Sequence, residues 1–465
     1  MTTPGAPAQP LRVAVFGSGP TGFYATDHLF KAPGLTVEVD LYDRLPTPYG
    51  LVRGGVAPDH QKIKTVTRAY ERTARNPRFR FYGGVEFGSD IRLADCRRYY
   101  HAVIYCVGAQ VDRAMRIPGE SLPRSHAATE FVAWYNGHPD YRDREFDLSR
   151  ESVAVVGVGN VAVDVCRVLA RSVDELKSTD IADYALEQLA ESRIREVHML
   201  GRRGPAQAAF TNPEIKELGE LEGADIRVRE DEAALDPVSQ EWVDSGGDKA
   251  APRKVEILQQ YAAEKRSGKP RTLTVRFLVS PVELIAGDDG GVARVKLVHN
   301  ELYRNERGTI RPRATDRFED LDAGLVFRSV GYRGVALPGV PFRDDWGVIP
   351  HSAGRVLDSP DGEHLPGQYC AGWIKRGPTG VIGTNKPDAL ETVQALLEDV
   401  AAGQHWQPEF PTADAVERFV AERVPTYFSF ADWKALDALE VARGKAEGRP
   451  RVKFVSVEEM QAAIR

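Results

Sequence analysis

The sequence LRVAVFGSGPTG at residues 11–22 decides the fold, because an apolar strand runs directly into a glycine loop and then into a helix-compatible stretch. In this pattern Gly17 allows a tight turn, Gly19 lets the backbone approach a pyrophosphate, and Gly22 lets the helix pack close to the strand. The free N–H groups at the start of the helix then face the anion. The pattern therefore predicts a βαβ unit that binds a dinucleotide.

A carboxylate at the end of the next strand indicates which dinucleotide this unit takes. The strand-like run at residues 35–42 ends in Asp43, which lies 21 residues beyond Gly22. A glycine-rich turn with a surface acid would be the alternative, but the strand before and the helix after favour the nucleotide site. An acid at this position accepts hydrogen bonds from ribose hydroxyls and repels a 2′-phosphate. The first unit is therefore expected to bind FAD or NAD and not NADP.

The same strand–loop–helix pattern returns about 140 residues later. The strand SVAVV at residues 152–156 leads into GVGNVA, in which Gly157 and Gly159 are followed by Ala162 at the third position. The strand at residues 196–200 then runs into Arg202 and Arg203. Two guanidinium groups there suit a 2′-phosphate, although adjacent arginines in isolation are usually a solvated loop. The second unit is predicted to bind NADP(H), which leaves FAD for the first.

Two further apolar strands that end in glycine suggest how the units are connected. Residues 101–107 end at Gly108, and residues 324–330 end at Gly331. We interpret them as matching exits, so the second unit is inserted into the first within an α/β fold of two Rossmann-like domains. The expected organisation is a disordered lead at 1–10, an FAD-binding domain at 11–108 and 331–465, and an NADP-binding domain at 109–330. Residues 410–465 show helical periodicity.

Bulk properties exclude several classes of protein. The 465 residues contain 42% hydrophobic and 28% charged residues and carry a net charge of −6, which is typical of a globular protein without general affinity for nucleic acid. No apolar run is long enough for a membrane span, and the N-terminal stretch lacks signal-peptide features, so we expect a cytoplasmic protein and a monomer. No Cys-x-x-Cys pair occurs, so no disulfide framework, iron–sulfur cluster or metal site is expected among the four cysteines, which are Cys96, Cys106, Cys166 and Cys370.

Three longer segments carry a resemblance to a known family. LVRGGVAPDH at 51–60, GRRGPAQAAF at 201–210 and GWIKRGPTGVIGTN at 372–385 closely resemble adrenodoxin reductase and the bacterial ferredoxin–NADP reductases of the same type. The resemblance covers nearly the whole chain and includes the order of the domains. It implies an FAD enzyme that oxidises NADPH and delivers single electrons to a small iron–sulfur protein, a ferredoxin, which feeds a cytochrome P450 or another redox enzyme.

The resemblance also implies which residues hold the two cofactors. Beside the glycines of the two loops, the positions that match the family's FAD contacts are Thr21, Asp43, Leu51, Phe87, Trp373, Gly380, Val381 and Ile382. At Thr21 and Phe87 the side chains differ from those common in the family, so backbone contacts are expected there. The positions that match NADP contacts are Gly159, Asn160, Val161, Arg202, Arg203, Glu214 and Gly380.

Family similarity further places His60 and Glu217 together near the flavin. Glu214 and Glu217 are spaced for one face of a helix. We interpret His60 and Glu217 as residues that tune the flavin region and orient the nicotinamide, because hydride transfer needs no proton from the protein. A lone histidine is otherwise more often structural. The loop at 377–383 leads into a helix whose N-terminus is expected to stabilise negative charge on the reduced flavin.

An acidic ferredoxin needs a basic docking surface, and the sequence offers several candidates. They are Arg53, Lys375, Arg376, Lys386, Arg253, Lys254, Lys265, Arg266, Lys269 and Arg271. Alternative functions remain open at this point. An NADPH-dependent flavin oxidase or diaphorase with a small-molecule acceptor, a flavin monooxygenase, and a non-catalytic NADP-binding sensor share these motifs, whereas a disulfide reductase would need the missing cysteine pair.

Overall fold

The computed structural model describes residues 4–265 and 267–465, so residues 1–3 and the docking candidate Arg266 lie outside the described part. The chain forms two compact units. Unit 1 comprises the residues up to Val56, His60–Val111 and Gly331–Arg465, and unit 2 comprises Ala57–Asp59 and Asp112–Val330. Unit 2 is therefore inserted into unit 1. The sequence places these junctions after residues 108 and 330.

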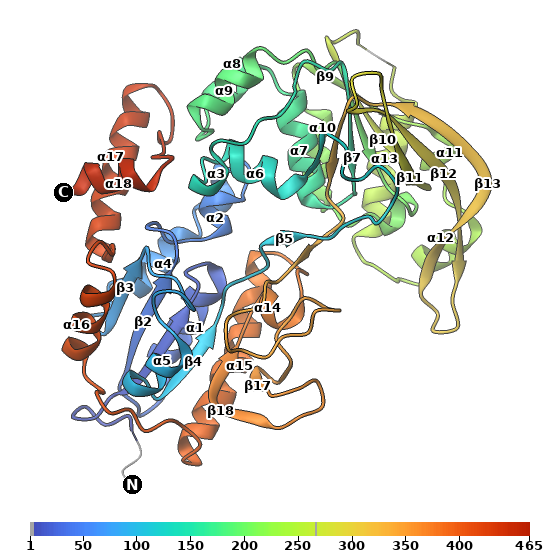
Figure 1. Cartoon of the computed structure of the whole chain (residues 1–465). Helices are drawn as coiled ribbons and strands as arrows, with labels where there is room; N and C mark the ends of the chain where they lie inside the picture. The colour runs from blue at the N-terminus through green and yellow to red at the C-terminus, as the bar shows by residue number, and fades with distance from the viewer. Residues whose placement is uncertain (1–3, 266) are drawn as a thin grey trace. The chain divides into compact units, whose positions relative to one another are not determined.

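Unit 1 is built on a mainly parallel sheet with the strand order β16-β17-β18-β4-β1-β2-β3 (Figure 1). The central strand β1 is buried at every position because both of its faces are covered, which explains its continuous apolar run. It pairs in parallel with β2 on one side and with β4 on the other. The strands are β1 (Leu11–Phe16), β2 (Val37–Asp43), β3 (Phe79–Gly83), β4 (Ala102–Tyr105), β16 (His351–Ser352), β17 (Arg355–Leu357) and β18 (His364–Cys370).

Helices from both ends of the sequence cover this sheet. Helix α15, from the C-terminal part, packs beside α1, from the N-terminal part, and both contribute to one apolar core with β1 and β2. The helices of unit 1 are α1 (Pro20–Phe30), α2 (Leu51–Gly54), α3 (Gln61–Lys64), α4 (Thr67–Ala74), α5 (Leu93–Tyr99), α14 (Trp373–Arg376), α15 (Asn385–Ala401), α16 (Ala413–Arg423), α17 (Phe430–Ala446) and α18 (Val457–Ile464). The last three agree with the helical periodicity predicted for residues 410–465.

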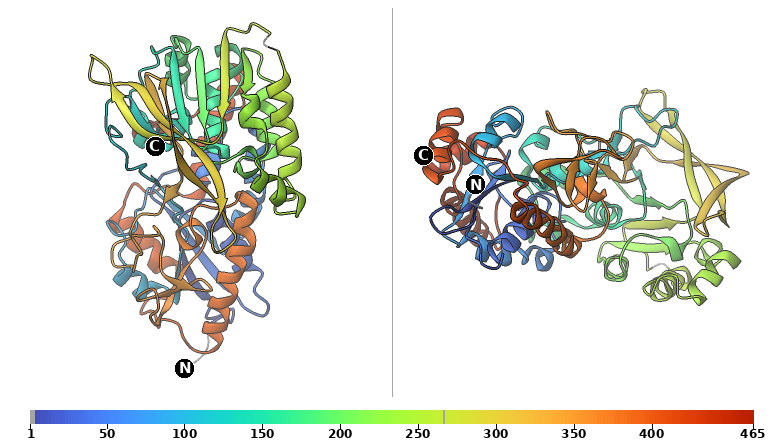
Figure 2. Two further views of the ribbon diagram at one scale, coloured as in Figure 1. Left: turned by 90° about the vertical axis from the view of Figure 1, so that its right-hand side faces the viewer. Right: turned by 90° about the horizontal axis from the view of Figure 1, so that it is seen from below.

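Unit 2 has a parallel sheet with the order β6-β14-β7-β8-β10-β9 and a separate antiparallel sheet β11-β12-β13. Figure 2 shows the long strands β12 and β13, in yellow and gold, as a twisted ribbon of their own. The strands are β6 (Ser125–Ala127), β7 (Ser152–Val156), β8 (Glu196–Leu200), β9 (Ala224–Val228), β10 (Arg271–Arg276), β11 (Val279–Ala286), β12 (Val292–Arg304), β13 (Ile310–Asp322) and β14 (Leu325–Arg328). The short strand β5 (Val111–Asp112) pairs with β15 (Tyr332–Arg333).

The helices of unit 2 flank its parallel sheet and include the two that carry predicted site residues, α7 and α10. They are α6 (Ala128–Tyr135), α7 (Asn160–Ala170), α8 (Val173–Lys177), α9 (Asp183–Ala190), α10 (Asn212–Gly219), α11 (Glu230–Ala233), α12 (Pro237–Asp244) and α13 (Ala251–Ala263). None of the helices in the described part of the chain combines the length and the apolar character that crossing a bilayer requires.

The α/β fold class predicted from the sequence is confirmed, and one local expectation differs from the structure. The sequence at residues 273–279 is strand-like throughout, but Leu278 has a φ of 56° and the chain turns there between β10 and β11. The expected disorder at 1–10 does not hold for residues 5–9. There the backbone N–H of Thr36 donates to the Gly5 carbonyl oxygen at 2.6 Å, and the Gly5 N–H donates to the Gln9 carbonyl oxygen at 2.7 Å.

Candidate functional site

The first glycine loop, between β1 and α1, has the geometry that its predicted roles require. Gly17 has a φ of 104°, and a Cβ there would lie 2.4 Å from the Cys106 carbonyl oxygen. A Cβ on Gly22 would lie 2.0 Å from the Gly17 carbonyl oxygen, so the loop and the helix touch. At Gly19, by contrast, no described atom lies within 4 Å of that position. The loop is therefore tight at both ends and open in the middle, where a ligand can approach the backbone.

Asp43, at the end of β2, holds this loop in place. Its carboxylate accepts hydrogen bonds from the backbone N–H of Ser18 at 2.9 Å, from the Ser18 hydroxyl, and from the backbone N–H of Leu45 at 3.0 Å. Burial raises the pKa of Asp43, and these hydrogen bonds act in the opposite direction. The acid at the strand end thus lies directly against the glycine loop, where the sequence predicts the ribose.

The segment that begins the motif at 51–60 lies against the same loop. The backbone N–H of Tyr49 donates to the Ser18 carbonyl oxygen at 3.0 Å, and a Cβ on Gly50 would lie 3.0 Å from the Cα of Gly19. Leu51, the first residue of α2, is 44% exposed. Its exposure beside the open loop is consistent with the predicted contact to FAD.

Phe87 contributes to the core and offers little side-chain surface to a ligand. Its ring centroid lies 4.7 Å from that of Phe16 and 5.4 Å from that of Tyr105, and the residue is buried. A contact between Phe87 and FAD would therefore involve its backbone, as the sequence analysis expects.

The loop at 372–385 meets the first glycine loop through Thr21. A Cβ on Gly372 would lie 2.3 Å from Oγ1 of Thr21, so only glycine fits there. Oγ1 of Thr21 also donates to Oδ1 of Asn385 at 3.1 Å. Because Thr21 lies in the first turn of α1 and Asn385 begins α15, the N-termini of these two helices converge. Both helix dipoles therefore favour an anion at the same place.

Arg376 stiffens this loop, a role that the sequence analysis missed. Its guanidinium group donates to the Thr379 carbonyl oxygen, to Oγ1 of Thr379 at 3.2 Å, to Oγ1 of Thr384 at 3.3 Å and to Oδ1 of Asn385 at 2.7 Å. The indole N–H of Trp373 donates to the same Thr379 carbonyl oxygen at 3.2 Å. The only sequence signal was an arginine directly before a glycine-rich loop, which is equally typical of a solvated surface.

The tip of the loop presents the three positions predicted to hold FAD through their backbone. Gly380 has a φ of 79°, and a Cβ there would lie 2.4 Å from Oγ1 of Thr384. Val381 is 53% exposed, and Ile382 is half-buried. Oγ1 of Thr384 donates to the Val381 carbonyl oxygen at 2.6 Å, so this hydrogen bond closes the turn at the tip.

The second glycine loop, in unit 2, repeats the geometry of the first. Gly157 has a φ of 139°, and a Cβ there would lie 2.3 Å from the Ser329 carbonyl oxygen. A Cβ on Gly159, by contrast, would have no described atom within 4 Å. Asn160 begins α7, and its Oδ1 accepts the backbone N–H of Thr211 at 2.9 Å. Val161 is half-buried in the first turn of α7. The loop again leaves one open position beside a helix N-terminus.

Arg202 and Arg203 follow β8, as the sequence predicts. Arg202 is exposed and Arg203 is half-buried. Burial lowers the pKa of Arg203, and the charges of Arg202 and Arg311 lower it further. A half-buried cation among other cations is unfavourable unless an anion binds. This cluster is therefore a candidate site for a phosphate.

A buried arginine organises the carboxylates of unit 2, and the sequence analysis missed it too. The side chain of Arg167, in α7, is fully buried and forms ion pairs with Asp59 at 2.6 Å and with Asp164 at 2.6 Å. Glu214 and Glu217, which both lie on α10 as predicted, have carboxylate oxygens 3.5 Å and 3.9 Å from it. Glu214 is therefore an ion-pair partner inside unit 2 as well as a candidate NADP contact. The sequence signal for this ion pair was the presence of Asp164 and Arg167, three residues apart, within the otherwise apolar run at 161–170.

His60 precedes α3 in unit 1 as its N-cap residue, whereas Glu217 belongs to unit 2. The segment Ala57–Asp59 directly before His60 groups with unit 2, where Asp59 binds Arg167 and Arg171. The pairing of His60 with Glu217 stays a prediction.

Several docking candidates are already engaged and cannot act as free surface cations. Arg53 pairs with Glu440, Lys375 is 3% exposed and pairs with Asp388 at 3.2 Å, and the buried Lys254 donates to the Ala208 carbonyl oxygen. These basic residues stabilise the fold because burial holds them against acceptors. The candidates with side chains still exposed in the described part of the chain are Arg253, Lys265 and Lys386.

The fold and the loop geometry define a protein with two dinucleotide-binding α/β units. No family model matches the chain. The chain is 45% identical over 454 residues to the NADPH-ferredoxin reductase FprA of Mycobacterium leprae, covering 96% of this chain and 97% of that protein. It is 41% identical over 462 residues to the human mitochondrial NADPH:adrenodoxin oxidoreductase, covering 97% and 91%.

Comparison with solved structures gives the same result. The structure of Mycobacterium tuberculosis FprA in complex with NADPH matches with a TM-score of 0.89 and 43% identity, covering 98% of this chain and 99% of that one. The chain belongs to the family of NADPH-ferredoxin reductases and NADPH:adrenodoxin oxidoreductases. This membership confirms the resemblance on which the sequence analysis relied.

Proposed function

We propose that this chain is an FAD-dependent NADPH:ferredoxin oxidoreductase, which takes hydride from NADPH and passes single electrons to a small iron–sulfur protein. One observation carries the assignment of the two nucleotides. Each unit has an open glycine loop, but the strand beside the first loop ends in Asp43 and the strand beside the second ends in Arg202 and Arg203. A carboxylate selects a plain ribose, and paired guanidinium groups select a 2′-phosphate.

The residues of unit 1 fit FAD. A Cβ on Gly19 would have no described atom within 4 Å, so the loop leaves space for a ligand there. The hydrogen bond between Thr21 and Asn385 brings the N-termini of α1 and α15 together beside this space. These termini would bind the pyrophosphate and stabilise negative charge on the flavin ring. FAD, when bound, supplies the group that accepts a hydride and releases electrons one at a time. The chain's own task is to orient the ring, which the loop held by Arg376 would do through its backbone at 380–382.

Unit 2 would bind and orient NADPH. The helix N-terminus at Asn160 would hold the pyrophosphate, and Arg202 with Arg203 would hold the 2′-phosphate. Glu214 and Glu217 lie on one face of α10, where Arg167 fixes their position. We propose that Glu217, together with His60, orients the nicotinamide.

The proposal extends to partner and location. An acidic ferredoxin would dock on basic residues that remain exposed, such as Lys386. The four cysteines are free and buried in the structure, which is typical of a protein in a reducing compartment and supports a cytoplasmic location.

Anaerobic titration of the purified holoenzyme tests the nucleotide assignment. NADPH should bleach the flavin absorbance at far lower concentration than NADH. Replacing Arg202 or Arg203 with alanine should raise the KM for NADPH by about ten- to a hundredfold, because one charge-assisted phosphate contact is lost. Arg227→Ala, at an exposed position on β9, is the matched control and should behave as wild type. Equal use of NADH and NADPH by the wild type would contradict the proposal.

Cytochrome c reduction through an added ferredoxin tests the acceptor. At subsaturating ferredoxin the rate should fall as ionic strength rises, because salt screens the attraction between a basic surface and an acidic partner. A rate that is independent of ferredoxin, with oxygen consumed instead, would favour a flavin oxidase.

A further inference from the structure

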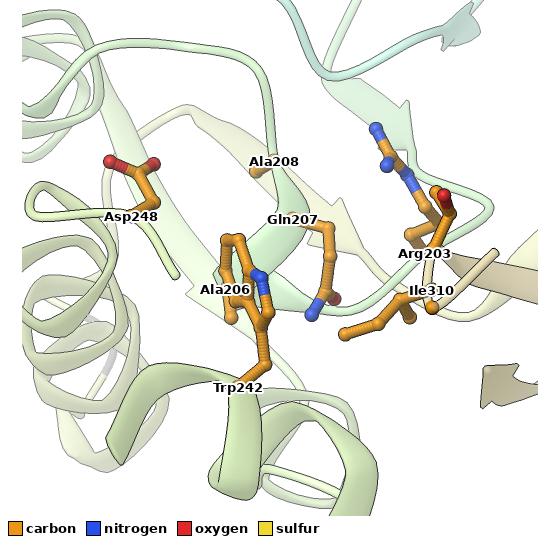
Figure 3. A pocket seen from close by; sticks show the side chains of 9 residues that line it. Arg203, Ala206, Gln207, Ala208, Trp242, Asp248 and Ile310 are labelled. Carbon is orange, nitrogen blue, oxygen red and sulfur yellow. The ribbon is translucent and has the colours of Figure 1, made fainter. Parts of the chain in front are cut away.

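The C-terminal helices α16, α17 and α18 have no part in the proposed sites. The cavity of about 360 Å³ in unit 2 is lined by Arg203 and belongs to the NADP(H) site already proposed (Figure 3). Helices α16–α18 hold no residue that the sequence predicts to contact a cofactor. One buried carboxylate on α17, Glu440, nevertheless binds α2, the short helix that begins with the predicted FAD contact Leu51.

Glu440 and Arg53, on α2, form a bidentate ion pair. The Glu440 side chain is fully buried, and its carboxylate accepts hydrogen bonds from both terminal nitrogens of Arg53, at 2.8 Å and 2.5 Å. It also accepts from the Arg451 guanidinium group at 3.0 Å and from the backbone N–H of Phe454 at 2.9 Å. Burial acts to raise the pKa of Glu440, but Arg53 and Arg451 outweigh it and lower that pKa. An ionised carboxylate with four donors around it fixes both the distance and the angle of α2.

Two further contacts join α17 and the segment after it to the same stretch of chain. The Arg53 guanidinium group lies over the ring of the buried Trp433, 5.0 Å from its centroid. The indole N–H of Trp433 donates to the Tyr49 hydroxyl at 3.3 Å. Nζ of Lys453 donates to the Arg53 carbonyl oxygen at 3.3 Å. Residues 49–53 are therefore held at both ends by the C-terminal part of unit 1.

The stretch that is held in this way has a strained backbone and lies on the first glycine loop. Tyr49 has a φ of 87° and Gly50 a φ of 48°. A bulky residue rarely adopts a positive φ, and such a conformation persists only where the surrounding structure holds it. The backbone N–H of Tyr49 donates to the Ser18 carbonyl oxygen, and a Cβ on Gly50 would lie 3.0 Å from the Cα of Gly19. The position of Leu51 beside the open loop thus depends on contacts made outside the loop.

We propose that Glu440 is a positioning residue for FAD, because its ion pair with Arg53 holds residues 49–51 against the first glycine loop and so keeps Leu51 in place beside the flavin. The inference rests on the proposed function, since it assumes that Leu51 contacts FAD. It gives α17 a part in the flavin site, although the sequence of this helix carries no nucleotide-binding motif.

Two substitutions remove this link from opposite sides. Glu440→Gln replaces one acceptor oxygen by an amide group in a place where all four neighbours donate. Arg53→Met keeps an apolar side chain on Trp433 and leaves Glu440 with Arg451, so this variant decides the question if Glu440→Gln does not fold. Each variant should release flavin about tenfold faster than wild type on dilution, measured by flavin fluorescence, because a charge-assisted contact is lost. The visible circular dichroism of the flavin still bound should change, since the packing around the ring changes.

Asp437→Asn is the matched control for loss of stability alone. Asp437 lies on the same helix, but its carboxylate binds Lys434 and Arg451, each at 2.8 Å, instead of Arg53. This variant should lower the thermal unfolding midpoint and keep the flavin release rate and the circular dichroism of the wild type. The double variant Arg53→Met, Glu440→Gln should release flavin no faster than the faster single variant, because both changes break one contact. All variants should bind adenosine 2′,5′-bisphosphate, which carries the 2′-phosphate of NADP(H), as the wild type does.

The outcomes separate this inference from the proposed function. If Arg53→Met released flavin no faster than Asp437→Asn, or if its bound flavin kept the wild-type circular dichroism, the inference would be overturned. Multiplicative effects in the double variant would overturn it too. In each of these cases the proposed function would stand, provided that NADPH still bleached the flavin of the wild type. A wild-type enzyme whose flavin NADPH failed to bleach would contradict the proposed function itself, whatever the variants did.

Discussion

Oγ1 of Thr21 lies 3.1 Å from Oδ1 of Asn385, although 364 residues separate them in the sequence. This contact ties the first turn of α1 to the first turn of α15, so the return of the chain to unit 1 completes the site that its first strand begins. Arg376 donates to the same Oδ1 at 2.7 Å. Oδ1 of Asn385 thus accepts one hydrogen bond from the end of the first glycine loop, through Thr21, and one from Arg376, the arginine that holds the loop at 377–383.

Replacing Arg376 should loosen this loop and weaken FAD binding. Arg376→Lys keeps the charge but cannot reach Thr379, Thr384 and Asn385 together, because a lysine lacks the planar fork. We expect FAD affinity to fall about ten- to a hundredfold, and the affinity for adenosine 2′,5′-bisphosphate to stay unchanged. Fluorescence of released flavin on dilution measures the first, and calorimetry measures the second.

A matched control for this substitution is Arg343→Lys. Arg343 also lies in unit 1, but it pairs with the neighbouring Asp345 at 2.8 Å, on the surface. Its replacement should leave flavin retention unchanged. If Arg376→Lys released flavin no faster than Arg343→Lys, the loop would not depend on the guanidinium group.

Replacing Arg167 should destabilise unit 2 strongly. Its fully buried side chain faces Asp59 and Asp164, so Arg167→Met would leave buried carboxylates without their counter-charge. We expect a loss of about 3–5 kcal/mol in the free energy of unfolding, since breaking one side of a buried ion pair costs that much. Arg171→Met is the control. Because the Arg171 side chain is 24% exposed, this variant should lose less of the free energy of unfolding. Equal thermal unfolding midpoints for the two variants would show that Arg167 is not the organising charge.

The sequence predicted those parts of the site that follow from local chain geometry. Gly17 and Gly157 have positive φ, and Gly22 touches the backbone of Gly17, because a strand that turns into a helix within a few residues allows no side chain there. Asp43 could be placed for a similar reason, since it ends the neighbouring parallel strand and must lie at the same edge of the sheet.

The parts that depend on contacts between distant segments could not be predicted. Arg376 and Lys375 are adjacent basic residues that look alike in the sequence, yet one holds a loop and the other is buried against Asp388. Arg167 binds Asp59, which lies 108 residues away in the sequence. The spacing of apolar and polar residues along the chain predicts helices and strands but not a pairing between such distant residues.

A double-mutant cycle tests the predicted cooperation of His60 and Glu217. His60→Gln and Glu217→Gln should each slow the reduction of the flavin by NADPH, measured by stopped-flow absorbance, by about tenfold, while both variants retain FAD. If the two side chains act as a pair, the double variant should be little slower than either single variant. Multiplicative effects would show that they act independently. A variant with unchanged flavin reduction would remove that residue from the proposed role.

Asp112 is a buried carboxylate whose protonation state affects the stability of the folded protein. It lies in β5 where the chain enters unit 2, and it accepts hydrogen bonds from the backbone N–H of Thr129 at 3.3 Å and from the Thr129 hydroxyl. Burial raises the pKa of Asp112 to about 6, although the hydrogen bonds from Thr129 act against this. The folded protein therefore binds this proton more tightly than the unfolded chain does.

Since the folded-state pKa is raised, the stability from this group is fully present below pH 4 and is lost as the pH rises through about 6. The loss amounts to about 2–3 kcal/mol by pH 7.5. Asp112→Asn, which cannot ionise and still accepts a hydrogen bond from Thr129, should match wild type near pH 3.5 and unfold at a higher temperature near pH 7.5. Thermal unfolding at both pH values, with the exposed Asp361→Asn as control, measures the difference. A constant gap between Asp112→Asn and wild type across this range would show that Asp112 ionises as freely in the folded protein as in the unfolded chain.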